Sequence, residues 1–157
     1  MAEGKDPKLA LFELYLATAE KVSDRRAQAN AWMLSVNSAI VALYGYLQAD
    51  KMAVSAAQKG LWLLAIPAAG VLVCLAWAAM LTSYRKLNRA KFEVLQQIEL
   101  DLPVQLFTLE QKLYHQTGRR GLARLERYIP FCFAGLYLAL FIAAILAQFV
   151  AAGSLPD

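Results

Sequence analysis

Histidine and cysteine are scarce in this sequence, which has one histidine, His115, and two cysteines, Cys74 and Cys132, among 157 residues. These residues lack the spacing of a metal site, and both cysteines lie in or beside apolar stretches, where cysteine acts as a small apolar residue. The chain also lacks a phosphate-binding loop, a dinucleotide fingerprint and a nucleophile elbow. We therefore predict no catalytic residue, no metal and no cofactor, and we expect that the protein is not an enzyme.

Charged residues are absent from three long stretches, residues 31–49, 61–82 and 131–155. Each stretch exceeds the roughly 18 apolar residues that identify a candidate transmembrane helix. A buried core helix of a soluble protein would explain one such stretch. Three of them in so short a chain leave too little polar sequence to cover them. We therefore predict an all-α membrane protein with three transmembrane helices, at 31–49, 61–82 and 131–153.

Proline and glycine are scarce around the first two spans, so both helices should extend beyond the membrane. The pair Asp6-Pro7 is typical of a helix start, and Gly45 is the sole glycine from there to residue 49. The sequence predicts one helix over 7–49, cytoplasmic over 7–30, and a second over 61–102, cytoplasmic over 83–102. A cytoplasmic connector, 103–130, completes a single membrane domain over 1–157.

The two cytoplasmic helical segments each carry apolar residues at helical spacing. We expect these stripes to pack on each other or on the same stripe of another subunit. In the connector, Thr108 to Gln111 resembles a capping box that opens a short helix, and residues 122–129 are expected to form a short basic helix. The stripe residues are Leu9, Phe12, Leu16, Ala19 and Val22 in the first helix, and Leu87, Val94, Ile98 and Leu102 in the second.

Lysine and arginine are distributed unevenly around the three spans. Fourteen of the 16 precede the first span or lie between the second and third, and two lie between the first and second. The positive-inside rule places the 14 in the cytoplasm. The N-terminus is therefore expected to be cytoplasmic and the C-terminus extracytoplasmic.

Several basic residues should lie at the inner headgroup layer, where they either bind specific anionic lipids or only orient the protein. No nucleic-acid-binding motif accompanies them, so we expect no nucleic acid partner. The residues are Arg25, Arg26, Arg85, Lys86, Arg89 and Arg127.

Small residues recur along one face of the first span and one face of the third. In lipid, small residues allow helix backbones to approach closely. These faces therefore pack either within the three-helix bundle or between subunits, and we expect at least one face to serve each purpose. The first small-residue face is Ala31, Ser35, Ser38, Ala42 and Gly45, and the second is Gly135, Ala139, Ala143, Ala147 and Ala151.

One amide, Asn37, lies inside the first span, one heptad after Asn30 and one before Tyr44. A buried amide in lipid needs a partner, so Asn37 is expected either to form an interhelical hydrogen bond or to belong to a polar strip that lines a pore or groove. No ionisable Asp, Glu, Lys, Arg or His lies within any span. This argues against a proton-coupled transporter and weakens a selective ion channel.

Three polar motifs resemble the RipA-type family of small bacterial inner-membrane proteins, which are described as octameric. The resemblance covers about residues 10 to 145, and it implies a homo-octamer in a bacterial cytoplasmic membrane. Members of that family carry an acidic residue and a tryptophan after a Leu-Pro segment; this chain has Glu110 and then Gln111 there. The motifs are Glu20 to Arg26 with Ala29-Asn30 and Asn37-Ser38; Ser83 to Phe92 with Glu99 and Leu102-Pro103; and Glu126, Ile129-Pro130 and Leu136-Tyr137.

Three functions remain open on this sequence. The first is a homo-oligomeric membrane scaffold, a ring of thin bundles with the long helices as a cytoplasmic collar. The second is a pore formed by the same ring, with Asn30, Asn37 and Tyr44 as candidate lining residues. The third is an accessory or effector subunit that acts on the membrane with a cytoplasmic partner whose identity the sequence does not give. In each case the other partners are membrane lipids.

Overall fold

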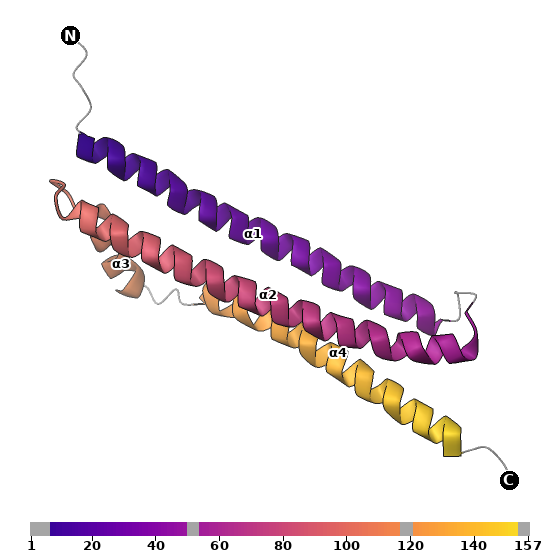
Figure 1. Cartoon of the computed structure of the whole chain (residues 1–157). Coiled ribbons are helices and arrows are strands. Elements are labelled where there is room, and N and C mark those ends of the chain that lie inside the picture. Colours follow the sequence, from indigo (N-terminus) through magenta and orange to yellow (C-terminus); the bar gives the residue numbers. More distant parts are fainter. Residues whose placement is uncertain (1–6, 50–53, 117–120, 154–157) are drawn as a thin grey trace. The chain divides into compact units, whose positions relative to one another are not determined.

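The computed structural model describes residues 7–49, 54–116 and 121–153, which form four α-helices (Figure 1). Helix α1 spans Pro7–Gln48 and α2 spans Ala56–Glu99, so these two are the longest, with 42 and 44 residues. Helix α3, Leu106–Gln116, is short, and α4 spans Gly121–Gly153. No strand occurs in the described ranges.

Helix α2 begins five residues earlier than the sequence predicts because its N-terminus carries a capping box. The hydroxyl of Ser55 accepts a hydrogen bond from the backbone N–H of Gln58, at 3.3 Å, and the Gln58 side chain accepts one from the backbone N–H of Ser55, at 3.1 Å. The helix ends at Glu99 instead of residue 102. Leu102 precedes Pro103, and proline disfavours the helical conformation of the residue before it.

The second part of the predicted connector over 103–130 is helical and continues directly into the predicted third span. Residues 121–130 belong to α4, which runs through Pro130 without interruption to Gly153. The predicted basic helix at 122–129 and the third span are therefore one helix. Pro130 is buried in the structure. A proline is tolerated in such a helix where neighbouring groups satisfy the backbone that it frees.

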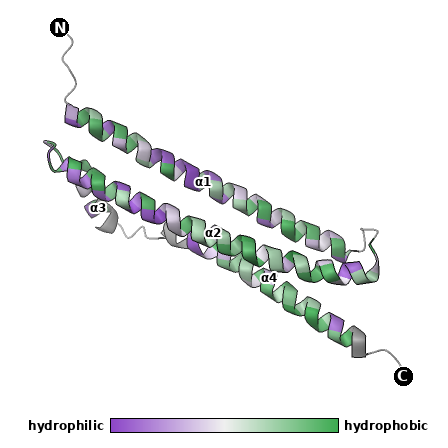
Figure 2. Cartoon of the chain, in the orientation of Figure 1, coloured by the Kyte–Doolittle hydropathy of each residue, from purple (hydrophilic) through white to green (hydrophobic). Residues whose placement is uncertain are grey.

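Among the described residues, two helices are long and apolar enough to cross a membrane: α2, and residues Glu126–Val150 of α4. Figure 2 shows hydrophilic residues in the middle of α1 and also within α2, next to its apolar stretch. The predicted span at 31–49 contains Ser35, Asn37, Ser38 and Gln48, and these polar side chains lower its mean hydropathy. Three spans remain a prediction.

The chain divides into two compact units. Residues 1–30 with 80–124 form one, which we call the charged unit, and residues 31–79 with 125–157 form the other, the apolar unit. The long helices α1 and α2 contribute to both.

The charged unit buries Ala19, Val22, Leu81 and Leu95. Ala19 and Val22 belong to the predicted stripe of the first helix, although Leu9 at its start is 39% exposed. The predicted stripe of the second helix is offset from the buried face. Leu87 is 46% exposed, whereas Leu95 is fully buried, because the helix turns a different side toward α1.

The apolar unit has a core of Tyr44, Leu47, Cys74, Trp77, Tyr137 and Ala144. Along α2 the buried residues Pro67, Gly70, Cys74 and Trp77 are three or four residues apart, which is the spacing of one helix face. The ring of Phe133 lies between those of Trp77 and Tyr137, with centroid distances of 6.3 and 6.5 Å.

Candidate functional site

Asn37 lies at the centre of the apolar unit and is completely buried. Its side-chain N–H donates to the carbonyl of Met33 at 2.8 Å, and its Oδ1 accepts from the thiol of Cys74 on α2 at 3.3 Å. A thiol is a weak donor, but here it gives the buried amide oxygen of Asn37 a hydrogen-bond partner. The predicted interhelical hydrogen bond of Asn37 is present. Cys74 is buried as predicted, and it also has this polar role.

Tyr137 connects the third helix of this unit to the first. Its hydroxyl donates to the backbone carbonyl of Asn37 at 3.0 Å, and the side chain is fully buried. On the way to α1 its ring passes Gly70 of α2. A Cβ built at Gly70 would lie 2.8 Å from three atoms of that ring, so a glycine is required for this approach. Helices α1, α2 and α4 therefore meet at Asn37, Gly70 and Tyr137.

The predicted pore-lining strip does not form a continuous outer face. Asn37 is 0% and Tyr44 6% exposed, because both side chains point into the apolar unit of their own chain. Asn30 belongs to the charged unit, where it is half-buried and has partners of its own. The lining of a pore or groove by these residues stays a prediction.

The two small-residue faces lie outside the buried core of the apolar unit, although Ala143 and Ala147 also line a cavity of that unit. Every member whose side chain the structure describes is exposed, in α1 and in α4 alike. A Cβ added at Gly45 or at Gly135 would meet no atom of the chain within 4 Å. The side chain of Ala151 lies outside the described ones. Contacts within the apolar unit are instead made by the larger residues of its core.

In the charged unit, Glu99 joins the end of α2 to the start of α3. Its carboxylate accepts hydrogen bonds from the backbone N–H groups of Phe107 and Thr108 and, at 3.0 Å, from the Thr108 hydroxyl. These N–H groups lie in the first turn of α3, which has no acidic residue of its own. A carboxylate at a helix N-terminus satisfies unpaired donors and interacts favourably with the helix dipole. The predicted capping box at Thr108 is wrong, because Glu99 caps this helix.

Aromatic residues hold α3 against both long helices. The ring of Phe107 lies 5.9 Å from that of Phe12 on α1 and 6.1 Å from that of Phe92 on α2, in tilted arrangements that aromatic pairs favour. One turn away, Lys91 donates to the hydroxyl of Thr18 at 2.9 Å, and its amine lies 4.8 Å from the centre of the Tyr15 ring. This part of the unit is therefore held by cations, aromatics and one buried carboxylate.

The predicted headgroup-binding residues fall into two groups. Arg25, Arg26, Arg85, Lys86 and Arg89 all belong to the charged unit, and Arg127 belongs to the apolar unit. A hydrogen bond of 3.3 Å from Asn88 to Ser23 joins α2 to α1 close to these residues. The basic residues of the first group that lie on α1 are therefore beside those that lie on α2. Arg89 forms an exposed ion pair with Glu93 at 2.9 Å. Headgroup binding remains a prediction.

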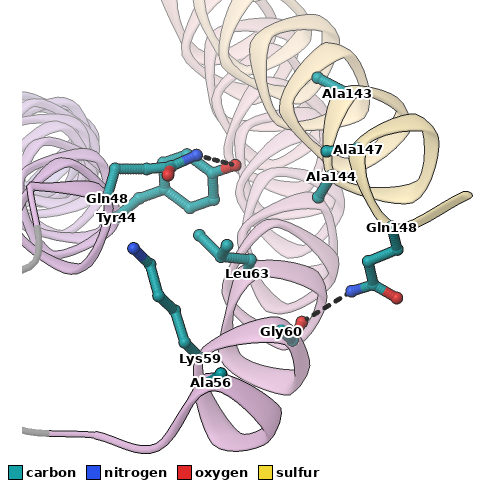
Figure 3. Close-up of a pocket in the computed structure, with 10 residues that line it drawn as sticks. All are labelled: Tyr44, Gln48, Ala56, Lys59, Gly60, Leu63, Ala143, Ala144, Ala147 and Gln148. Carbon is teal, nitrogen blue, oxygen red and sulfur yellow. Dashed lines mark hydrogen bonds between the residues drawn. The ribbon is translucent and has the colours of Figure 1, made fainter. Parts of the chain in front are cut away.

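A cavity of about 490 Å³ opens in the apolar unit near the start of α2. Figure 3 shows Lys59 extending toward Tyr44 and Gln48, which are joined by a hydrogen bond of 3.5 Å. On the other side, the Gln148 amide donates to the carbonyl of Gly60 at 3.1 Å. The rest of the lining is apolar: Ala56, Leu63, Ala143, Ala144 and Ala147. Of the lining residues, Tyr44 was predicted to line a pore or groove, and Ala143 and Ala147 were predicted to pack against other helices; no role was predicted for Lys59, Gln48 or Gln148.

A comparison with known protein families matches residues 9–146 to the octameric membrane protein family (8xMP). The chain belongs to this family. Comparisons with curated proteins and with solved structures found no match. The resemblance to an octameric membrane protein family that the polar motifs indicated is thereby confirmed.

The residues matched to the octameric membrane protein family include those of all the hydrogen bonds described above except the one donated by Gln148. Asn37, Gly70, Glu99 and Tyr137 lie within the matched residues. None of these four was predicted with its partner. Three of the contacts join residues far apart in the chain, and the fourth, the cap by Glu99, crosses a turn. A polar residue or a glycine on an otherwise apolar helix face is the sequence signal that could have suggested these four contacts.

Within residues 7–49, 54–116 and 121–153, no group of three or more His, Cys, Asp or Glu residues could hold a metal ion. The side chain of His115 lies outside the described ones. That this member of the octameric membrane protein family is not an enzyme remains a prediction.

Proposed function

We propose that this protein is a homo-octameric scaffold of a bacterial cytoplasmic membrane, not an enzyme, and that its small-residue faces form the contacts between subunits. Each subunit would cross the membrane three times, with its N-terminus in the cytoplasm and its C-terminus outside. The observation that carries the proposal is the outward orientation of both faces. Membership of an octameric membrane protein family supports the same conclusion.

The small-residue faces suit a contact between helices in lipid. Lipid tails are as apolar as leucine, so apolar burial alone does not drive helices together in a bilayer. Close backbone approach supplies dispersion contacts instead, and it requires small side chains. The open space around Gly45 and Gly135 leaves room for a helix of a neighbouring subunit.

The charged unit supplies a second reason to expect neighbours. Leucines remain exposed on two of its helices, including Leu11 and Leu14 of α1 at 53% and 65%. On α3, Leu106, Leu109 and Leu113 are each more than half exposed. They are three or four residues apart, so they form one stripe. Exposed apolar patches of this kind mark interaction surfaces. Neighbouring copies would cover them in a cytoplasmic collar.

The two alternatives receive less support. A pore needs polar or small groups around the ring axis, and its candidate residues Asn37 and Tyr44 are satisfied inside the subunit. An effector with a cytoplasmic partner would use the leucine stripe of α3 for that partner. The same stripe serves a collar without a further protein, so the scaffold is the simpler proposal.

The experiment is the mass of the purified protein in mild detergent, measured by light scattering with the detergent subtracted. We expect an octamer for the unaltered protein. Ala42→Leu and Ala139→Leu, one on each small-residue face, should lower the mass because leucine holds the backbones apart.

The matched control is Ala76→Leu, which makes the same change at an exposed position of α2 outside both faces. Its octamer should remain intact. A monomeric unaltered protein would refute the proposal, and an octamer that survives both face substitutions would refute the assignment of the interface.

A further inference from the structure

We propose that the cavity formed by the ends of α1 and α4 and the start of α2 binds the phosphate of an anionic lipid headgroup, with the lipid chain lying against Ala144 of α4 and Leu63 of α2. The inference rests on the proposed function only in its membrane placement. It assigns a ligand site that is separate from the arginines and lysines near the opposite ends of the spans.

The cavity has the chemistry of a phosphate site. Lys59 contributes a positive charge, and Figure 3 shows its side chain directed into the space between Tyr44 and the α2 backbone. The Tyr44 hydroxyl and the amides of Gln48 and Gln148 line the same space and are hydrogen-bond donors. Hydrogen bonds from charged donors to phosphate oxygens are about twice as strong as neutral ones. A cation with several neutral donors therefore favours an anion.

The helix that carries Lys59 adds to the positive potential. Lys59 lies in the second turn of α2, whose N-terminus holds the positive end of the helix dipole. The charge of Lys59 and the helix N-terminus therefore contribute positive potential to the same end of the cavity. The capping box of Ser55 and Gln58 satisfies donors at the helix start, but its groups are neutral. A bound phosphate would interact favourably with the dipole and with Lys59.

The opposite wall of the cavity suits a hydrocarbon chain. Ala143, Ala144 and Ala147 line the cavity from α4, and Leu63 lines it from α2. The volume of about 490 Å³ lies within the range of about 300–1,000 Å³ that ligand pockets show. A polar end and an apolar wall in one open space fit an amphiphile better than a free anion.

The position along the chain fits the headgroup layer. Gln48 ends α1, Gln148 lies near the end of α4, and Lys59 precedes the apolar stretch that begins at Leu61. Trp62, just after Lys59, is 51% exposed, and tryptophan is enriched where a membrane meets water. The cavity therefore lies where a lipid phosphate would be found.

The test measures which lipids the full-length protein retains. The protein is placed in bilayer nanodiscs of equal parts phosphatidylcholine and phosphatidylglycerol, and released complexes are weighed by native mass spectrometry. We expect the retained lipid to be enriched in phosphatidylglycerol. Lys59→Gln should lower the affinity for it about ten-fold, by loss of the charged contact. Ala56→Leu, which adds bulk to the cavity lining, keeps the charge and lies outside both small-residue faces, should also remove the enrichment.

The matched control is Lys112→Gln, which removes one charge from an exposed lysine of α3. It should retain the enrichment. Equal retention of both lipids by the unaltered protein would overturn the proposal, as would enrichment that persists in Lys59→Gln and Ala56→Leu. Inorganic phosphate added in detergent serves to separate the two sources of phosphate. Binding of phosphate alone, without lipid enrichment in nanodiscs, would assign the cavity to a free anion and overturn the lipid.

The same spectra give the subunit number, so the two proposals can fail separately. A monomer with phosphatidylglycerol bound would refute the octamer and leave the lipid site intact. If Lys59→Gln dissociates an octamer that shows no lipid enrichment, a neighbouring subunit occupies the cavity and the lipid proposal is overturned.

Discussion

The charged unit and the apolar unit are built from the same two long helices, yet different contacts hold each together. In the charged unit, α3 is fixed by the buried carboxylate of Glu99 and by the rings around Phe107. In the apolar unit, the main polar contacts are those of the Cys74 thiol with the Asn37 amide and of the Tyr137 hydroxyl with the Asn37 backbone carbonyl. The Tyr137 ring also packs against Gly70. No described side chain that takes part in those contacts is charged.

The difference follows from the solvent expected around each unit. Water strengthens the association of apolar side chains, so Phe12, Phe92 and Phe107 gain by burial in the charged unit. Lipid gives no such gain, and contacts there depend on close approach and on hydrogen bonds between helices. A helix that passes from one solvent to the other therefore needs a different set of contact residues in each half.

Gly70→Ala should give the largest effect, because its Cβ would lie 2.8 Å from three ring atoms of Tyr137. A ring fixed by its own hydrogen bond cannot move aside, so we expect a loss of about 3 kcal/mol, the upper end for overpacking. Denaturant unfolding in detergent, followed by circular dichroism, measures it. Ala76→Leu is the control, since it enlarges an exposed residue of the same helix outside both small-residue faces.

The pairing of Gly70 with Tyr137 can be tested directly by combining Gly70→Ala with Tyr137→Leu. Removing the ring should recover part of the loss, so the two changes should not add. If the losses in unfolding free energy were strictly additive, the Tyr137 ring would not be the reason that residue 70 must be glycine. Close packing would then not explain how the contacts of the apolar unit differ from those of the charged unit.

Glu99→Ala should give the next largest effect, and in the charged unit alone. It leaves the N–H groups of Phe107 and Thr108 without their acceptor, which costs about 2 kcal/mol. Hydrogen exchange should become faster at these two amides and through α3, while amides around Asn37 keep their protection. Glu93→Ala, an exposed carboxylate on the same helix, is the control. Equal acceleration in both units would show that they unfold together.

Tyr137→Phe should give the smallest effect. It removes the hydroxyl that donates to Asn37 and keeps the ring against Gly70. Hydrogen bonds between helices in membranes contribute about 0.6 kcal/mol on average, so we expect a loss of that order in the same unfolding experiment. A loss as large as that of Gly70→Ala would show that the hydrogen bond, and not the packing, dominates this unit.

The helices could largely be predicted from the sequence, and the direction in which they face could not. The absence of helix breakers, together with the uncharged stretches, predicted most of the ends of α1 and α2 to within a few residues. In an apolar helix, however, hydropathy does not distinguish the inner side from the outer. The buried face of α2 contains Gly70, Cys74 and Trp77, which share no chemical character, so periodicity did not reveal it.

The candidate sites show the same division. The small-residue faces could be identified from spacing, but their outward orientation needed the structure. Asn37 could be predicted to need a partner, whereas Cys74 as that partner depended on how the helices rotate. Glu99 looked like one more charge at a helix end. Its role depends on a turn that returns α3 to the carboxylate, and no local pattern encodes that turn.

The contact of Tyr137 with Asn37 also dictates an order of events during synthesis. It joins residues 100 positions apart, whereas α1 and α2 are adjacent along the chain. Local contacts form sooner than distant ones, and the N-terminal part of a chain leaves the ribosome first. The α1–α2 hairpin must therefore exist for a time with Gly70 and Asn37 uncovered. During that interval another newly made copy can bind the uncovered surface of the hairpin. This ends when α4 packs on the hairpin and Tyr137 covers Gly70 and Asn37.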